Sequence, residues 1–361
     1  MKTVFVAGSF ARNDIAWFNA SGRLEIYSDL DIYVVISGDS DLESCRRRAR
    51  AAASTILLEG EDFEIFPSMD VGVYTVEDLL AQPARPGTVE ITDSHWVLYG
   101  DAGIPEMMRK QSNARIDEKE ALYLLENRLI EKERLFARNW TSPSPGLERY
   151  AMYTAHKTCM DAGSALLIYL DLYSTSATER LSYIRNAAEY PEIQELLSKD
   201  DLDQIERSHQ AIEDLQQALQ KGDASLGSVW DSVEAVVLAL WRGMAARLFQ
   251  VGDKHSWDEL VRTRCCEGDI AGNFRELVVL GKRMELGWWR SLFVGARNMR
   301  LSPLDSLRLS GLVAVILERR EEGTAALERG FIPHLDRLSR AFGHSTGGIF
   351  ERARELFEKI N

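Results

Sequence analysis

The spacing of apolar residues changes partway along the chain. Up to about residue 100, short runs rich in β-branched and aromatic residues predict strands, at 3–7, 30–36, 63–66, 69–75 and 96–99. One helix is expected among them, at 43–58. Farther on, apolar residues recur at three- and four-residue spacing, which is typical of packed amphipathic helices. The pattern predicts an α+β fold, with a small mixed sheet in the N-terminal part and a mostly α-helical remainder.

Two stretches rich in proline and glycine, 81–87 and 141–146, are predicted to be loops. A charged helix is expected between them, at 116–139. The helices expected after the second loop lie at 147–172, 177–188, 201–220, 226–250, 272–287, 303–318 and 347–359. The predicted division is an N-terminal domain, a connecting helix and one or more helical domains, at 1–105, 106–140 and 147–361. Five tryptophans of the helical part are expected in its core: Trp230, Trp241, Trp257, Trp288 and Trp289.

Two aspartates stand at the start of the second predicted strand. Asp29 and Asp31 belong to the run Ser-Asp-Leu-Asp-Ile-Tyr-Val-Val. Side chains two residues apart on a strand share a face, roughly 6.6 Å apart along the backbone. Two carboxylates this close repel each other, and burying them without a cation would be costly. Mg²⁺ accepts oxygen ligands of this kind, and paired ions are the usual device for displacement at phosphorus. The spacing therefore favours a Mg²⁺ site, with two ions expected and Mn²⁺ able to replace them.

The first predicted strand ends in Gly8-Ser9, which would suit a phosphate group. A glycine lets backbone N–H groups approach a phosphate closely, and a serine hydroxyl adds a donor. Arg12, just beyond, could add positive charge near a triphosphate. Gly8, Ser9 and Arg12 are therefore the predicted phosphate-binding residues.

Together these residues resemble the signature of the polymerase-beta nucleotidyltransferase superfamily, in particular its minimal, aminoglycoside-type members with a helical C-terminal domain. That signature is a glycine-serine turn, a spacer, an Asp-x-Asp pair in a strand and a third carboxylate on a neighbouring strand. Residues 69–74 are similar to the third strand, and 96–100 to the strand that often closes such domains. The resemblance covers about residues 3–100 and implies that Asp29 and Asp31 hold two metal ions. It also implies that Asp70 joins them at the catalytic metal and that Ser9 contacts the triphosphate.

By this resemblance the chain would be a magnesium-dependent enzyme. It would transfer a nucleoside monophosphate from a nucleoside triphosphate, with ATP favoured, to a hydroxyl group and release pyrophosphate. The acceptor would bind against the helical residues 147–361, and it could be a small molecule, a sugar or glycan intermediate, or a protein. The general base would be Asp70 or an acidic residue of the helical part. A second hypothesis is a regulatory or antitoxin-like module that only binds nucleotide or a partner; intact Ser9, Asp29 and Asp31 count against it.

The composition narrows the choice of partners. With 43 basic and 56 acidic residues, the net charge is −13, which argues against broad binding to nucleic acid and favours a cationic acceptor over RNA. No segment approaches the ~18 uninterrupted apolar residues of a membrane span. Four cysteines without zinc spacing favour reduced thiols and a cytoplasmic location.

The sequence departs from the family pattern in two places. Nineteen residues (10 to 28) separate Ser9 from Asp29, which is a longer spacer than is common in the family. Within this spacer, an inserted hairpin beside the site is predicted at residues 15–24. The first strand also begins almost at Met1, without the helix that normally precedes it. Either the chain lacks that helix or its natural start lies upstream.

Two assignments within the predicted site have rivals. Glu64 is the alternative third carboxylate, but Asp70 is preferred because it opens a clearly alternating strand, in which Gly72 would leave room for metal, water or a hydroxyl. His156 and Lys157 lie on a predicted helix and could reach a phosphate or the acceptor. A partly buried polar helix face is the preferred interpretation of that pair.

Overall fold

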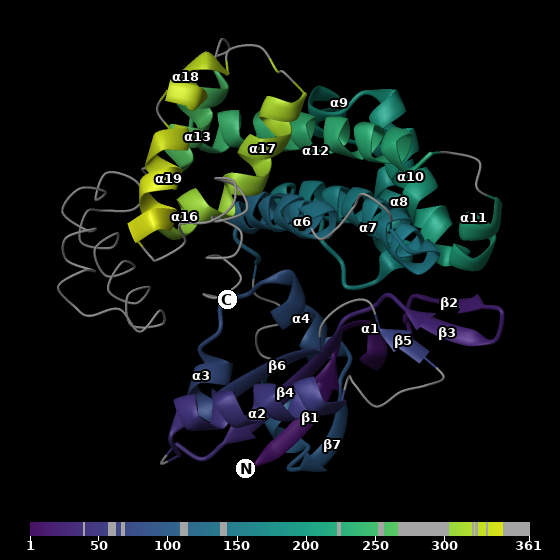
Figure 1. The fold of residues 1–361 in the computed structure, drawn as a ribbon, viewed down its shortest axis with the longest axis vertical. Coiled ribbons are helices and arrows are strands. Elements are labelled where there is room, and N and C mark those ends of the chain that lie inside the picture. Colours follow the sequence, from purple (N-terminus) through teal and green to yellow (C-terminus); the bar gives the residue numbers. More distant parts are fainter. Residues whose placement is uncertain are drawn as a thin grey trace. The chain divides into compact units, whose positions relative to one another are not determined.

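The computed structural model describes residues 1–38, 40–56, 63–65, 69–108, 115–137, 143–221, 225–251, 256–265, 303–319, 321, 324–329 and 331–341 (Figure 1). The chain forms two compact units, and neither is continuous in sequence. The first comprises Met1–Glu120, Ser144–Ala187 and Asp203–Val229, and the second Ala121–Pro143, Ala188–Leu202 and Trp230–Asn361. Every described strand belongs to the first unit, and the described part of the second is helical. The predicted α+β class is confirmed.

The main sheet of the first unit has four strands in the order β6-β4-β1-β7. These are β1 (Thr3–Ala7), β4 (Leu30–Ile36), β6 (Met69–Thr75) and β7 (Trp96–Gly100). β1 runs antiparallel to both of its neighbours, whereas β4 and β6 are parallel. The sheet is therefore mixed, as predicted, and it places β4 in the interior with β1 and β6 on either side.

One face of this sheet is covered by three short helices, α3 (Val76–Leu80), α4 (Pro86–Asp93) and α5 (Gly103–Glu106). Their buried side chains Leu79, Ile91 and Ile104 pack against Phe5 and Val35 of the sheet. Another helix, α2 (Leu42–Ile56), packs on β6 (Figure 1). The prediction of a loop through residue 87 is wrong at its end. α4 already begins at Pro86. Proline is well tolerated at the first position of a helix, because the N–H that it lacks would have no hydrogen-bond partner in the first turn.

The predicted insertion is a hairpin of β2 (Trp17–Ala20) and β3 (Arg23–Ile26). Its two turn residues, Ser21 and Gly22, both have positive φ, at 56° and 99°, as the tight turns that match strand twist require. A third short strand, β5 (Phe63–Ile65), pairs in parallel with β3 and not with the main sheet. The hairpin prediction is confirmed, with its second strand extending to Ile26.

The first unit also contains helices from the later part of the chain. They are α7 (Pro145–Tyr169), α8 (Ala177–Arg185), α10 (Lys199–Glu213) from Asp203 onward, and α11 (Leu215–Lys221), while the 3-10 helix η2 (Ala187–Glu189) crosses the boundary between the units. The single helix predicted at 201–220 is broken in two. Asp214 ends α10 and its side chain accepts a hydrogen bond from the backbone N–H of Gln217, which caps the start of α11.

The second unit is built from α6 (Lys119–Ala137), α9 (Pro191–Leu196), α12 (Leu226–Leu248), α13 (Trp257–Cys265), α16 (Pro303–Arg308), α17 (Ser310–Glu318), α18 (Ala325–Arg329) and α19 (Phe331–Ala341). The helix predicted at 303–318 is interrupted at Leu309. Trp230, Trp241 and Trp257 are buried, which confirms them as core residues. The helices predicted at 272–287 and 347–359, with Trp288 and Trp289, lie outside the described residues.

A buried ion pair crosses the interior of the second unit. Arg264 on α13 lies 3.3 Å from Glu126 on α6 and 3.0 Å from Asp305 on α16. The Arg264 and Glu126 side chains are both almost completely buried.

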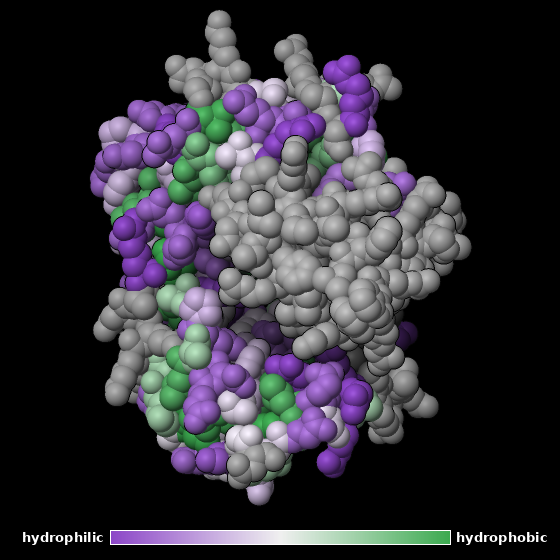
Figure 2. Space-filling model, turned by 90° about the vertical axis from the view of Figure 1, so that its left-hand side faces the viewer, coloured by the Kyte–Doolittle hydropathy of each residue, from purple (hydrophilic) through white to green (hydrophobic). Residues whose placement is uncertain are grey.

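On the face shown in Figure 2, hydrophilic residues cover most of the surface that the structure describes, with apolar residues in small patches. Among the described helices, none is long and apolar enough to cross a membrane.

Candidate active site

The turn after β1 lies directly beside the strand that carries the aspartates. Ala7 of β1 pairs with Asp31 of β4, so Gly8 emerges next to the Asp31 carboxylate. Gly8 has a φ of +67°, and a Cβ at this position would clash with Oδ2 of Asp31. Both facts disfavour a larger residue there. Ser9 follows in the first turn of α1 (Gly8–Ala11), so the glycine-serine turn and the Asp-x-Asp pair form one region of the surface.

Asp70 lies on the strand next to Asp31. β6 pairs in parallel with β4 so that Asp70 stands opposite Asp31, at the strand spacing of about 4.8 Å. Glu64 lies in β5, opposite Glu25 of the three-stranded sheet. The geometry therefore brings Asp31 together with Asp70, the residue preferred over Glu64 as the third carboxylate. The expectation for Gly72 is wrong, because the ring of Tyr74 fills the space above it.

The carboxylates of this region perturb one another. The pKa of Asp31 is raised to about 6, mainly by burial and also by the charges of Asp29 and Asp70, while the charge of Lys157 lowers it. Within the described residues, no three acidic, histidine or cysteine side chains converge closely enough to hold a metal ion as they stand. The donor set still fits Mg²⁺, because it consists of carboxylate oxygens whose mutual repulsion a divalent cation would relieve.

The raised pKa of Asp31 predicts how stability depends on pH without metal. The folded state binds this proton more tightly than the unfolded state, so the contribution is favourable below pH 4 and is lost as the pH rises through about 6. In EDTA at pH 7.5, Asp31→Asn should therefore raise the free energy of unfolding by up to about 3 kcal/mol. The gain should shrink towards zero at pH 4. An equal difference in melting temperature at both pH values would contradict this.

A lysine from a distant helix completes the charge pattern. Lys157 of α7 places Nζ 3.4 Å from Oδ2 of Asp29 and 6.0 Å from the centre of the Tyr153 ring. Lys157 is partly buried on a polar helix face, as preferred, and this face lies against the predicted site; its contact with a phosphate or the acceptor stays a prediction. His156 lies on the same helix, with Nδ1 3.3 Å from Oγ of Ser208, and burial lowers its pKa to about 4.

Glu90 lies at the candidate site, although the sequence did not indicate it. Its carboxylate, on α4, accepts a hydrogen bond from Arg12 at 2.7 Å and another from the Tyr173 hydroxyl at 2.7 Å. Arg180 lies 3.9 Å from the same carboxylate, and Glu90 also contributes to the raised pKa of Asp31. The guanidinium of Arg12 is thus held in a fixed place near the acidic residues. Its predicted contact with a triphosphate stays a prediction.

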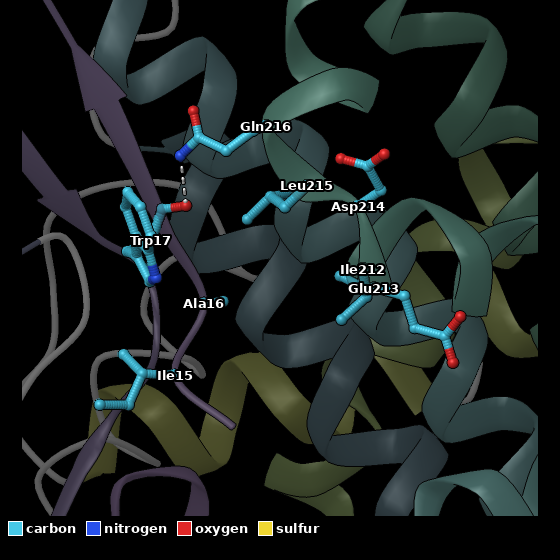
Figure 3. A pocket seen from close by; sticks show the side chains of 8 residues that line it. All are labelled: Ile15, Ala16, Trp17, Ile212, Glu213, Asp214, Leu215 and Gln216. Carbon is cyan, nitrogen blue, oxygen red and sulfur yellow. Dashed lines mark hydrogen bonds between the residues drawn. The ribbon is translucent and has the colours of Figure 1, made fainter. Parts of the chain in front are cut away.

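A cavity of about 170 Å³ lies where the inserted hairpin meets α11 (Figure 3). It is lined by residues 15–17 and 212–216, and Nε2 of Gln216 donates a hydrogen bond to the Trp17 carbonyl at 3.1 Å. Ligand pockets usually have volumes of about 300–1,000 Å³, so this cavity is too small for a whole substrate. We interpret it as a packing gap at the contact between the hairpin and α11.

Comparison with known proteins adds no family assignment. The sequence matches the model of no known protein family, and no curated protein is significantly similar to it. The likeness to nucleotidyltransferases therefore depends on the residues and the geometry described above.

Proposed function

We propose that the chain is a metal-dependent nucleotidyltransferase that transfers a nucleoside monophosphate from a nucleoside triphosphate, with ATP favoured, to an acceptor hydroxyl. The observation that supports this most strongly is the register of the sheet. It brings a glycine-serine turn beside Asp31, and Asp70 opposite Asp31, from segments far apart in the sequence. Lys157 adds a positive charge beside Asp29. We propose a cytoplasmic protein with a small-molecule, glycan or protein acceptor.

Each residue has a role that follows from its surroundings. The carboxylates of Asp29, Asp31 and Asp70 would hold Mg²⁺, which when bound neutralises charge on the triphosphate and polarises the reacting phosphoryl group. Gly8 allows the backbone to approach a phosphate, and Ser9 offers a hydroxyl donor. As the acceptor oxygen bonds to the α-phosphorus, its proton passes to an acidic side chain, for which we propose Asp70. The bond to pyrophosphate breaks, and pyrophosphate leaves.

Binding is the first test of this proposal. Mg²⁺ together with a nucleoside triphosphate should stabilise the protein by about 2.7 kcal/mol at a hundredfold excess over Kd, because the cation relieves the repulsion among the carboxylates. The measurement is a thermal-shift titration with each of the four common triphosphates. Mg²⁺ alone, and nucleotide in EDTA, are the controls and should give smaller shifts. If no magnesium–nucleotide pair raises the melting temperature, the chain has no active site of this kind.

Transfer is the second test, and it separates an enzyme from a binding module. Pyrophosphate release should appear only when a suitable acceptor is present, so the assay needs a panel of cationic small molecules, sugars, proteins and RNA. Nucleotide binding without pyrophosphate release over the whole panel would favour the regulatory or antitoxin-like module.

A further inference from the structure

Two series of residues face each other in the first unit, one on β3 and the segment that follows it and one on α7. Glu25, Tyr27 and Asp29 are two residues apart, whereas Arg149, Tyr153 and Lys157 are four apart. Two residues of extended chain rise about 6.6 Å, and four residues of α-helix rise about 6.0 Å. Because the two spacings nearly match, each member of one series can meet one member of the other.

The contacts follow this pairing in order. The Arg149 guanidinium binds the Glu25 carboxylate through two nitrogens, one of them at 2.9 Å. The Tyr27 ring stacks on the Tyr153 ring with their centres 5.6 Å apart. Lys157 then reaches Asp29. We call these three contacts the hairpin–α7 ladder.

The first two contacts of the ladder are much firmer than the third. Glu25 and Tyr27 are 4% and 1% exposed, and the Tyr27 hydroxyl donates a short hydrogen bond to Glu25. The Arg149 guanidinium also lies over the Phe18 ring, 4.8 Å from its centre. A buried, bidentate ion pair keeps its geometry better than a solvated one.

The third contact is longer than the first and partly solvated. The Asp29 side chain is 41% exposed and its distance from the Lys157 ammonium is 3.4 Å, which is long for a charge-assisted hydrogen bond. A pair of this kind contributes little to stability by itself. The contact with Asp29 therefore does little to fix the place of Lys157, which depends on how α7 packs, and the buried end of the ladder is part of that packing.

We propose that Glu25 and Arg149 are positioning residues that hold Lys157 beside Asp29, where its ammonium is a resident counter-ion that a divalent cation must displace. The inference rests on the proposed function, because it takes Asp29 as a metal ligand. It goes further by giving the buried ion pair, at the far end of the ladder, control over metal affinity at Asp29.

Lys157→Met is expected to change two affinities in opposite directions. Mn²⁺ alone should bind about fivefold more tightly, since a competing unit charge a few ångströms away has been removed. Magnesium–nucleotide should bind more weakly, because the displaced ammonium no longer faces the triphosphate. Calorimetry on the full-length protein measures both. Unchanged Mn²⁺ affinity in Lys157→Met would overturn the counter-ion proposal.

Glu25→Gln and Arg149→Met test the positioning step. In the wild-type background, both variants should bind Mn²⁺ somewhat more tightly and magnesium–nucleotide somewhat more weakly. In the Lys157→Met background, they should change neither affinity. Arg149→Lys keeps the charge but loses the two-nitrogen contact with Glu25, so its affinities should lie between those of the wild type and of Arg149→Met. Glu25→Gln preserves the shape of the side chain and should fold even if Arg149→Met does not. Equal effects of these substitutions in both backgrounds would overturn the proposal.

A matched control comes from the second unit. Arg264→Met breaks the buried pair with Glu126 and should lower the melting temperature without altering either affinity, so it reports plain destabilisation. If the wild-type protein binds neither Mn²⁺ nor magnesium–nucleotide, the proposed function fails together with this inference. If it binds both and Lys157→Met changes neither affinity, only this inference fails.

Discussion

Asp29→Asn and Asp31→Asn should each reduce nucleotidyl transfer by ~10³-fold or more. Asparagine keeps the shape of aspartate but removes its charge and replaces one of its two oxygen donors. Asp31 has an unusually strong need for a cation, since burial and the neighbouring carboxylates raise its pKa to about 6. The rate of pyrophosphate release, with saturating nucleotide and acceptor, measures the loss.

The loss should come from the site and not from unfolding. Circular dichroism should be unchanged in both variants, and Asp31→Asn should melt at a higher temperature than the wild type in EDTA. Asp200→Asn is the control, because Asp200 is an exposed residue of α10, outside the first unit, and its replacement should leave transfer unchanged. Near wild-type turnover in either Asp29→Asn or Asp31→Asn would show that the two-metal assignment is wrong.

The parts of the site that were predictable are those encoded by local patterns. Asp29 and Asp31 are two residues apart at the start of a strand, and Gly8 ends another, so alternation and backbone freedom indicate them directly. Lys157 and Glu90 lie on helices, where lysine and glutamate are common on solvated faces. Their roles depend on what α7 and α4 pack against, which involves contacts 128 and 78 residues apart in sequence.

Prediction of the fold was limited in the same way, by contacts between segments far apart in the sequence. The predicted strands begin and end within one or two residues of β1, β4, β5, β6 and β7. The partner of β5 was not predictable, because three residues carry too little pattern to choose between two sheets. Apolar residues likewise indicate that α7 is largely buried, and 162–168 are buried all round, but they do not show which unit the helix joins. The proline-rich stretch before it marks only where the helix begins.

Asp70→Ala should lose about 10²-fold or more in transfer, whereas Glu64→Ala should be close to silent. Asp70 stands opposite Asp31 on the adjacent strand, and it is exposed, so it can reach both a metal ion and an acceptor. Glu64 belongs to β5, whose register places it opposite Glu25. Glu25 is the residue that binds Arg149, which puts Glu64 beside the buried end of the hairpin–α7 ladder.

The two substitutions separate the metal site from the ladder when binding and transfer are measured together. In Asp70→Ala, magnesium–nucleotide binding should partly survive, because Asp29 and Asp31 still hold the ion nearest the nucleotide, while transfer falls with the loss of the proposed base. Both quantities should stay near wild type in Glu64→Ala. The reverse pattern, with Glu64→Ala inactive and Asp70→Ala active, would move the third carboxylate into the three-stranded sheet. The acceptor would then react beside the inserted hairpin and not over β6.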